Sequence, residues 1–124
     1  MTRVAIASPL VAVVCCTPII AEALAAALDG FAEVKSFPGC RGLTAALLGS
    51  MQPDAVIVES DEDAAAAAAY TRGSKTPVVH ISLADQRLRI WRQGSWTDQE
   101  AHETSPEAVR NAVLSSLYAR EVAR

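Results

Sequence analysis

The sequence predicts an α/β domain in which helices flank an open sheet of parallel strands. Four short apolar segments alternate with three segments of helical pattern, which is typical of strands joined by helical crossovers. The chain has 124 residues, of which 51% are hydrophobic, enough for one core and too few for a second domain. We therefore expect a single domain over residues 1–124.

The first half of the chain supplies three of the expected strands and two of the helices. Residues 10–16 form an apolar, valine-rich run that predicts a strand buried on both faces. Thr17 can cap the helix that follows, with Pro18 in its first turn, and Asp29-Gly30 ends it. The next elements are a strand at residues 31–37, a helix at 42–51 and a strand at 55–58.

The second half begins with six consecutive alanines, residues 64–69, which predict a helix because alanine has the highest helix propensity. The fourth strand is expected at residues 77–82. Ser105 is the expected N-cap of a last helix that runs through Val109, Val113, Leu117 and Val122.

The segment between the fourth strand and the last helix departs from the alternating pattern. Residues 87–91 alternate charged and apolar side chains, Gln93-Gly94-Ser95 resembles a turn, and residues 96–101 can return as a second strand. We therefore expect an altered, hairpin-like region over residues 83–104.

Charge and cysteine content narrow the class of protein. A net charge of −3 argues against binding of nucleic acid by this domain itself. The three cysteines, Cys15, Cys16 and Cys40, are an odd set with an adjacent pair, which is unsuited to a disulfide framework and favours the cytoplasm. Their spacing does not suggest a metal site. Residues 4–21 carry no charge, but Pro9 and Pro18 interrupt the run, so we favour a strand entering a helix over a membrane anchor or export signal.

Four motifs lie at the ends of the expected strands and at the start of the last helix. They are Cys15-Cys16-Thr17-Pro18 leading to Ala21-Glu22-Ala23-Leu24, Pro53-Asp54-Ala55-Val56-Ile57-Val58-Glu59-Ser60, Pro77-Val78-Val79-His80-Ile81-Ser82, and Thr104-Ser105-Pro106-Glu107. In this order they resemble the motifs of receiver domains of bacterial response regulators, most closely those linked to a helix-turn-helix output domain. The resemblance covers residues 10–82 and 105–122. It implies a flavodoxin-like fold, with an open parallel sheet of five strands flanked by helices and an altered region after the fourth strand.

The resemblance also implies that the usual phosphorylation site is degenerate. The family's acidic pair falls at Cys15 and Cys16, its phosphoacceptor Asp at Glu59, its switch Thr or Ser at Ser82, and its Lys near His102. Thiols are poor ligands for Mg²⁺, which prefers carboxylate and water oxygens. A histidine is mostly neutral at pH 7 and does not replace the lysine charge. We therefore expect no catalytic residues, no cofactor and no metal.

Each of these residues has a structural alternative. Cys15 and Cys16 could be reactive thiols before a helix N-terminus, but we favour small buried residues that close a strand. Glu59 could mimic the phosphorylated state, but we favour a solvated carboxylate in the acidic run of residues 59–63. His80 we interpret as a packed, hydrogen-bonded core histidine.

The hairpin-like region contains both tryptophans of the chain. Arg89, Ile90, Trp91 and Trp96 could form an interaction patch, because tryptophan and arginine are enriched at interface hot spots. The alternative is ordinary packing of one or both indoles on the sheet edge.

We expect a non-enzymatic signalling domain that regulates an attached or partner output, with transcription as the implied context, through protein contacts and as a homodimer. A DNA-binding domain would follow this chain at its C-terminal end, and no membrane association is expected. One alternative is a small-molecule sensor with a pocket near Cys16, Glu59 and Ser82. Another is a cysteine-dependent phosphocarrier or phosphatase, although no phosphate-gripping arginine follows Cys15 or Cys16 at the required spacing.

Overall fold

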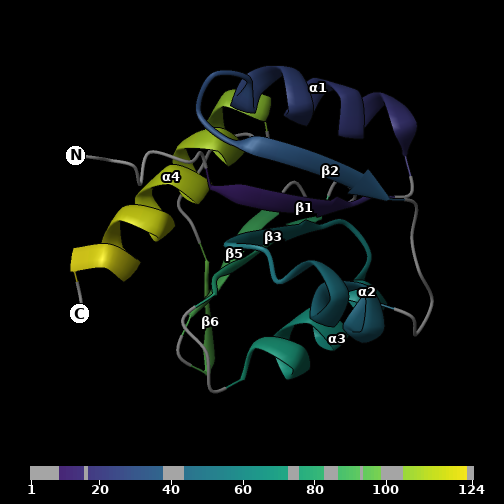
Figure 1. Ribbon diagram of the computed structural model, residues 1–124, viewed down its shortest axis with the longest axis vertical. Coiled ribbons are helices and arrows are strands. Elements are labelled where there is room, and N and C mark those ends of the chain that lie inside the picture. Colours follow the sequence, from purple (N-terminus) through teal and green to yellow (C-terminus); the bar gives the residue numbers. More distant parts are fainter. Residues whose placement is uncertain are drawn as a thin grey trace.

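The computed structural model describes residues 9–15, 17–37, 44–72, 76–82, 87–92, 94–98 and 105–122. The strands are β1 (Leu10–Val14), β2 (Glu33–Phe37), β3 (Ala55–Val58), β4 (Val78–Ser82), β5 (Arg87–Arg92) and β6 (Ser95–Asp98). The helices are α1 (Pro18–Leu28), α2 (Thr44–Met51), α3 (Asp61–Thr71) and α4 (Pro106–Val122). All six strands join one sheet in the order β2-β1-β3-β4-β5-β6 (Figure 1).

The prediction of a five-stranded, purely parallel, flavodoxin-like sheet is wrong. The strands β2, β1, β3 and β4 pair in parallel, but β5 pairs antiparallel with β4 and β6 pairs antiparallel with β5. Four residues, 83–86, separate Ser82 at the end of β4 from Arg87 at the start of β5. A parallel crossover needs a dozen or more residues, so this short connection requires β5 to turn back along β4. The fold is a mixed, six-stranded α/β sheet.

The antiparallel part is a hairpin that lies within the altered region. Arg92 pairs with Ser95 and Trp91 pairs with Trp96, so the chain reverses direction between Arg92 and Ser95. Gly94 has a φ of 89°, in the left-handed region that glycine adopts without a steric penalty. The second strand is described as far as Asp98, and its expected continuation to residue 101 lies outside the described residues.

The central strands are buried on both faces, as the apolar run at residues 10–16 predicts. Residues 11–14 are all 0% exposed. Because side chains alternate along a strand, Val11 and Val13 pack in the core beneath α1 and α4, whereas Ala12 and Val14 pack beneath α2 and α3. Figure 1 shows the resulting layers, with α1 and α4 on one side of the sheet and α2 and α3 on the other.

Helix α3 is longer than the alanine run alone predicts. It begins at Asp61 because the Ser60 hydroxyl accepts a hydrogen bond from the Asp63 backbone N–H at 3.0 Å. Three acidic residues fill its first turn, where the helix dipole favours negative charge. Residues 61–63 of the acidic run therefore start the helix and bring its N-terminus to the carboxyl ends of the strands.

Helix α4 starts as the sequence predicts. The Ser105 hydroxyl accepts a hydrogen bond from the Ala108 backbone N–H at 3.1 Å, and Val109, Val113 and Leu117 are buried against the sheet. Within the described part of the chain, every helix is too short or too polar to cross a lipid bilayer.

Candidate functional site

The carboxyl ends of β1, β3 and β4 lie at one edge of the sheet, where the sequence places its candidate site. Cys15 directly follows β1, Glu59 directly follows β3, and Ser82 is the last residue of β4. Cys16 and His102 lie outside the described residues. The structure therefore places three of the five predicted positions at this edge, on three neighbouring strands.

Glu59 joins the end of β3 to the start of α1. Its Oε1 accepts a hydrogen bond from the Thr17 backbone N–H at 3.2 Å, and its Oε2 accepts one from the Thr17 hydroxyl at 3.0 Å. The side chain is half-buried. The interpretation of Glu59 as a merely solvated carboxylate is therefore wrong, because both of its oxygens bind a residue 42 positions earlier in the sequence.

Thr17 occupies the N-cap position of α1, and Pro18 follows in the first turn, as predicted. The Thr17 side chain makes no capping hydrogen bond, and its hydroxyl donates to Glu59. The Glu59 carboxylate thus supplies the negative charge that the dipole of α1 favours at this end. The Glu59 carboxylate therefore links the start of α1 to the end of β3.

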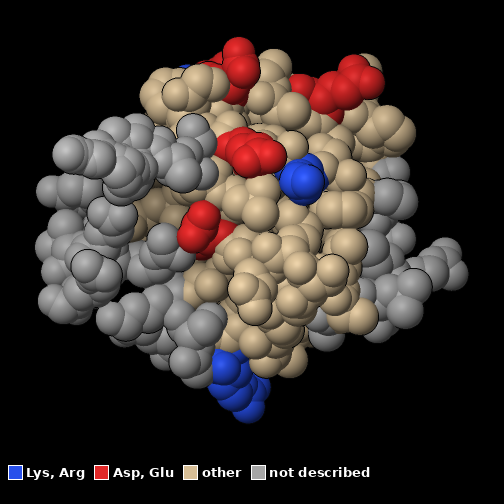
Figure 2. Space-filling model, in the orientation of Figure 1, with Lys and Arg blue, Asp and Glu red and all other residues tan. Residues whose placement is uncertain are grey.

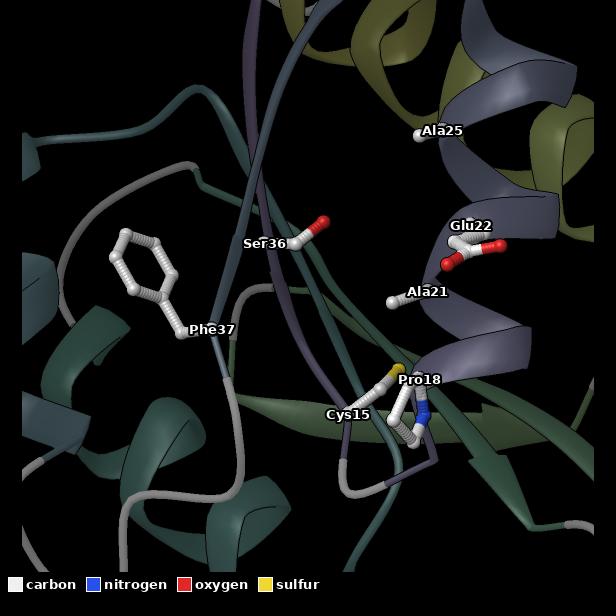
Figure 3. A pocket seen from close by; sticks show the side chains of 7 residues that line it. All are labelled: Cys15, Pro18, Ala21, Glu22, Ala25, Ser36 and Phe37. Atoms are coloured by element: carbon white, nitrogen blue, oxygen red, sulfur yellow. The ribbon is translucent and has the colours of Figure 1, made fainter.

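Cys15 is 4% exposed and lines an apolar cavity of about 400 Å³ between α1 and β2. Figure 3 shows its sulfur beside Pro18, with the small side chains of Ala21 and Ala25 facing Ser36 across the cavity. A thiol buried among alanine and proline side chains matches the interpretation of Cys15 as a small residue that closes a strand.

Ser82 lines a second cavity, of about 240 Å³, on the face of the sheet that α3 covers. The other lining residues are Asp61, His80, Arg87 and Arg89. In the antiparallel register His80 lies opposite Arg89 and Ser82 lies opposite Arg87. Because residues two apart on a strand share a face, the hairpin places all four side chains on one surface.

His80 is the buried centre of this second cavity, with 2% of its surface exposed. Its Nδ1 lies 2.8 Å from Nη2 of Arg89. A guanidinium group can only donate, so Nδ1 accepts and the proton of the neutral ring is on Nε2. The interpretation of His80 as a packed, hydrogen-bonded histidine is confirmed. The sequence analysis did not predict Arg89 as the partner of His80. The alternation of side chains along each strand was a usable signal, but the register between the two strands was not known.

The pKa of His80 is lowered below its ordinary value of 6.5. Burial is the main cause, because it disfavours the charged imidazolium, and the positive charge of Arg89 adds to it. The Asp61 carboxylate and the Glu59 backbone act in the opposite direction, and Arg87 lowers the pKa slightly further. His80 is therefore neutral at pH 7, with an N–H at Nε2.

The structure divides the residues of the predicted interaction patch. Trp91 is 8% exposed and packs in the core on the α2 and α3 side, whereas Ile90, also 8% exposed, packs in the core on the opposite face. Arg89 and Trp96 are half-buried, and the Arg89 guanidinium carbon lies 4.7 Å from the centre of the Trp96 ring. Trp96 also contacts the ring of His80, with centroids 5.9 Å apart.

The described residues do not fit the Mg²⁺ site that the resemblance implies in receiver domains. Cys15 offers a buried thiol, a soft ligand, and both oxygens of Glu59 already accept hydrogen bonds from Thr17. Within the ranges that the structure describes, no three His, Cys, Asp or Glu side chains converge so that they could hold a metal ion.

Surface charge on the face shown in Figure 2 is mainly acidic. Acidic side chains gather toward the top of that view, over α1 and β2, and basic side chains are scattered. Glu22, Asp29 and Glu33 are among the exposed acidic residues of this part of the chain. The described residues on this face therefore form no broad basic surface of the kind that binds a phosphate backbone.

A scan against protein-family models and searches of curated proteins and of solved structures gave no significant match. Function is therefore inferred from the residues and their geometry.

Proposed function

We propose that this chain is a receiver-like signalling domain that works without phosphorylation and regulates an attached or partner output through protein contacts. One observation carries the proposal. The carboxylate at the place of the family's phosphoacceptor, Glu59, is bonded through both oxygens to Thr17 in the loop before α1. At the position where a receiver gains and loses a phosphoryl group, the structure shows a carboxylate that is hydrogen-bonded to Thr17 through both oxygens.

Two physical reasons make transfer of a phosphoryl group to Glu59 unfavourable. A carboxylate oxygen must be available to attack phosphorus, whereas each oxygen of Glu59 accepts a hydrogen bond that a phosphoryl adduct would disrupt. The developing negative charge must also be stabilised, and a cluster of metal-ligating side chains is missing from the described residues. A lasting hydrogen-bonded contact between the end of β3 and the start of α1 suits a domain whose partners recognise one fixed conformation.

Other parts of the proposal rest on the resemblance and on the cysteine pattern. They are homodimerisation, an output domain that binds DNA and follows this chain, a role in transcription, and a cytoplasmic location. Of the described residues, Ile19 near the start of α1 is 73% exposed and Phe31 just after α1 is 49% exposed. Single exposed apolar side chains are common on protein surfaces, so the proposed protein contacts rest on the resemblance.

The test is incubation with Mg²⁺ and acetyl phosphate, or with Mg²⁺ and beryllofluoride, followed by intact mass and amide NMR. We expect no phosphoryl adduct and no shift changes at Thr17 or Glu59. A phosphorylatable receiver domain in the same buffer serves as the positive control. An adduct on an acidic side chain would contradict the proposal, and an adduct on Cys15 or Cys16 would favour a phosphocarrier or phosphatase instead.

A second candidate function, binding of a small molecule, is favoured by one observation. It is the 240 Å³ cavity that Ser82 lines, which is separate from the larger apolar cavity beside Cys15.

A further inference from the structure

The cavity between α3 and the β4–β5 pair has an unusual set of polar groups. Two guanidinium groups, one imidazole and one hydroxyl line it, against a single carboxylate. They come from three elements, since Asp61 opens α3, His80 and Ser82 lie on β4, and the two arginines lie on β5. Hydrogen-bond donors and positive charge therefore outweigh negative charge in the lining.

The Nε2 atom of His80 is buried and lacks a hydrogen-bond partner of good geometry. The nearest charged atom is Oδ1 of Asp61 at 3.3 Å, and the Asp61 side chain is 92% exposed. Since Nδ1 accepts from Arg89, Nε2 carries a proton that it can donate. The Glu59 backbone and the exposed Asp61 carboxylate lie near this donor, but neither pairs with it in good geometry, so a bound acceptor would complete its hydrogen bonding.

The two arginines differ in how firmly they are held. The Arg89 guanidinium is fixed between the ring of Trp96, 4.7 Å away, and Nδ1 of His80, 2.8 Å away. Arg87 donates through Nη2 to both oxygens of Asp98, at 2.8 and 2.9 Å, but the two side chains are 53% and 61% exposed. An exposed ion pair of this kind is weak, so Arg87 can exchange Asp98 for a ligand at little cost.

We propose that this cavity binds a small oxyanion, a phosphate or carboxylate group, through Arg87, Arg89 and the Nε2–H of His80. Guanidinium groups bind both kinds of oxyanion through charge-assisted hydrogen bonds. Asp61 is exposed at the rim and turns toward solvent when the anion enters. The site deepens the second candidate function, binding of a small molecule, and rests on it; it is separate from Glu59, whose oxygens accept hydrogen bonds from Thr17.

The volume and the location limit the ligand. A cavity of about 240 Å³ accommodates a single phosphate or carboxylate group with a few attached atoms, and its lining is mainly polar. The ligand is therefore a small, charged metabolite or the anionic end of a larger one. Binding would connect β4 to β5 of the hairpin, because its contacts come from His80 on β4 and from the two arginines on β5.

The test is titration of the full chain with inorganic phosphate, and separately with acetate, without Mg²⁺ and at constant ionic strength set with sodium chloride. Two signals report binding. One is the ring ¹⁵N shift of His80, and the other is tryptophan fluorescence, because Trp96 contacts both His80 and Arg89. We expect saturable binding of one of the two anions with a dissociation constant below about 1 mM.

The matched variants are Arg87→Gln and Arg92→Gln, which change exposed arginines on the same strand. Arg87 lines the cavity, whereas Arg92 does not. We expect Arg87→Gln to weaken binding by about tenfold or more and Arg92→Gln to leave it unchanged. Circular dichroism shows that both variants are folded.

The outcomes of these titrations either identify the class of anion or refute the site. Tighter binding of phosphate assigns a phosphoryl-bearing ligand, and tighter binding of acetate assigns a carboxylate, and both support the site. Signals that chloride reproduces at equal concentration, or an Arg87→Gln variant that binds as the parent chain does, would overturn it. The phosphorylation test is independent, because it requires Mg²⁺ and reports on Thr17 and Glu59.

Discussion

The ends of β3 and β4 are neighbours in the sheet, yet they use polar side chains in opposite ways. At the end of β3, both oxygens of Glu59 accept hydrogen bonds from Thr17, so the carboxylate has partners within the protein. On β4, His80 borders a cavity lined by two arginines, and its buried Nε2 makes no hydrogen bond of good geometry. The comparison separates a polar group that stabilises the fold from a group that is suited to a ligand.

The direction of the chain explains this difference. β3 is followed by α3 and lies beside β1, so the nearest donors are those of the loop before α1. β4 is followed by a four-residue connection, and β5 returns beside it. The antiparallel register then places Arg89 opposite His80 and Arg87 opposite Ser82. The hairpin thus brings positive charge to an edge that β1 and β3 supply with a carboxylate.

The largest expected effect is on the attachment of the hairpin. Trp91 is 8% exposed and packs with residues of α2 and α3, so Trp91→Ala leaves a large cavity beneath β5. We expect the free energy of unfolding to fall by about 3–5 kcal/mol, measured by urea denaturation followed by circular dichroism. A loss below about 1 kcal/mol would mean that the hairpin is not anchored by this indole.

The next largest effect on stability concerns the hydrogen bonds between Glu59 and Thr17. We expect Glu59→Ala to lower the free energy of unfolding by about 1–3 kcal/mol, because it leaves the half-buried donors of Thr17 without their acceptor. Glu62→Ala, at an exposed position in the first turn of α3, is the control and costs less than about 1 kcal/mol.

A double-mutant cycle sharpens the same point. Thr17→Val removes the hydroxyl donor, and once Glu59 is alanine that hydroxyl has lost its acceptor. We expect the two substitutions together to destabilise by less than the sum of their separate effects. Additive effects in urea denaturation would show that the two side chains are not coupled.

A third prediction concerns pH and the His80 side of the comparison. Because the pKa of His80 is lowered in the folded state, the unfolded chain binds the proton first as the pH falls below about 6.5. The free energy of unfolding therefore decreases from pH 7 toward the folded pKa, by at most ~1.4 kcal/mol per pH unit. Urea denaturation from pH 7.5 to 5 measures this slope.

The control for the pH effect uses both histidines of the chain. His80→Gln keeps an acceptor for Arg89 but removes the titrating ring, so we expect a shallower decrease than in the parent chain. His102→Gln is expected to retain the slope. A His80→Gln variant with an unchanged pH profile would contradict the assignment of the slope to His80.

The smallest expected effect on stability is that of Arg87→Gln. The ion pair between Arg87 and Asp98 is exposed, so its loss changes the free energy of unfolding by less than about 1 kcal/mol. The same variant is expected to lose phosphate or acetate binding. A destabilisation above about 2 kcal/mol would assign Arg87 to the fold rather than to a ligand.

Local patterns predict much of the fold. The four strands from β1 to β4 and all four helices lie where apolar runs, caps and alanine content place them, because these signals act over a few residues. The prediction of a parallel fifth strand is wrong, because the direction of a strand depends on the length of the connection that leads into it. Four residues between β4 and β5 exclude a crossover, and that length is readable in the sequence.

The site is less accessible to prediction, because its contacts join distant positions. The sequence places Glu59 at the end of β3, but its bond to Thr17 spans 42 residues and depends on how β1 and β3 pair. The cavity beside His80 depends on the β4–β5 register, which the sequence alone does not specify. Strand alternation, in contrast, is readable, and it separates Ile90 from Arg89 and Trp91.

The most direct test of the difference between the two strand ends is one NMR series on the ¹⁵N-labelled chain. One sample receives Mg²⁺ and beryllofluoride, and a separate sample receives inorganic phosphate. We expect beryllofluoride to leave the amide signals of Thr17 and Glu59 unchanged, because the carboxylate is already bonded through both oxygens. Specific, saturable shifts of those two amides with beryllofluoride would contradict the lasting contact between Glu59 and Thr17 and the phosphorylation-independent function.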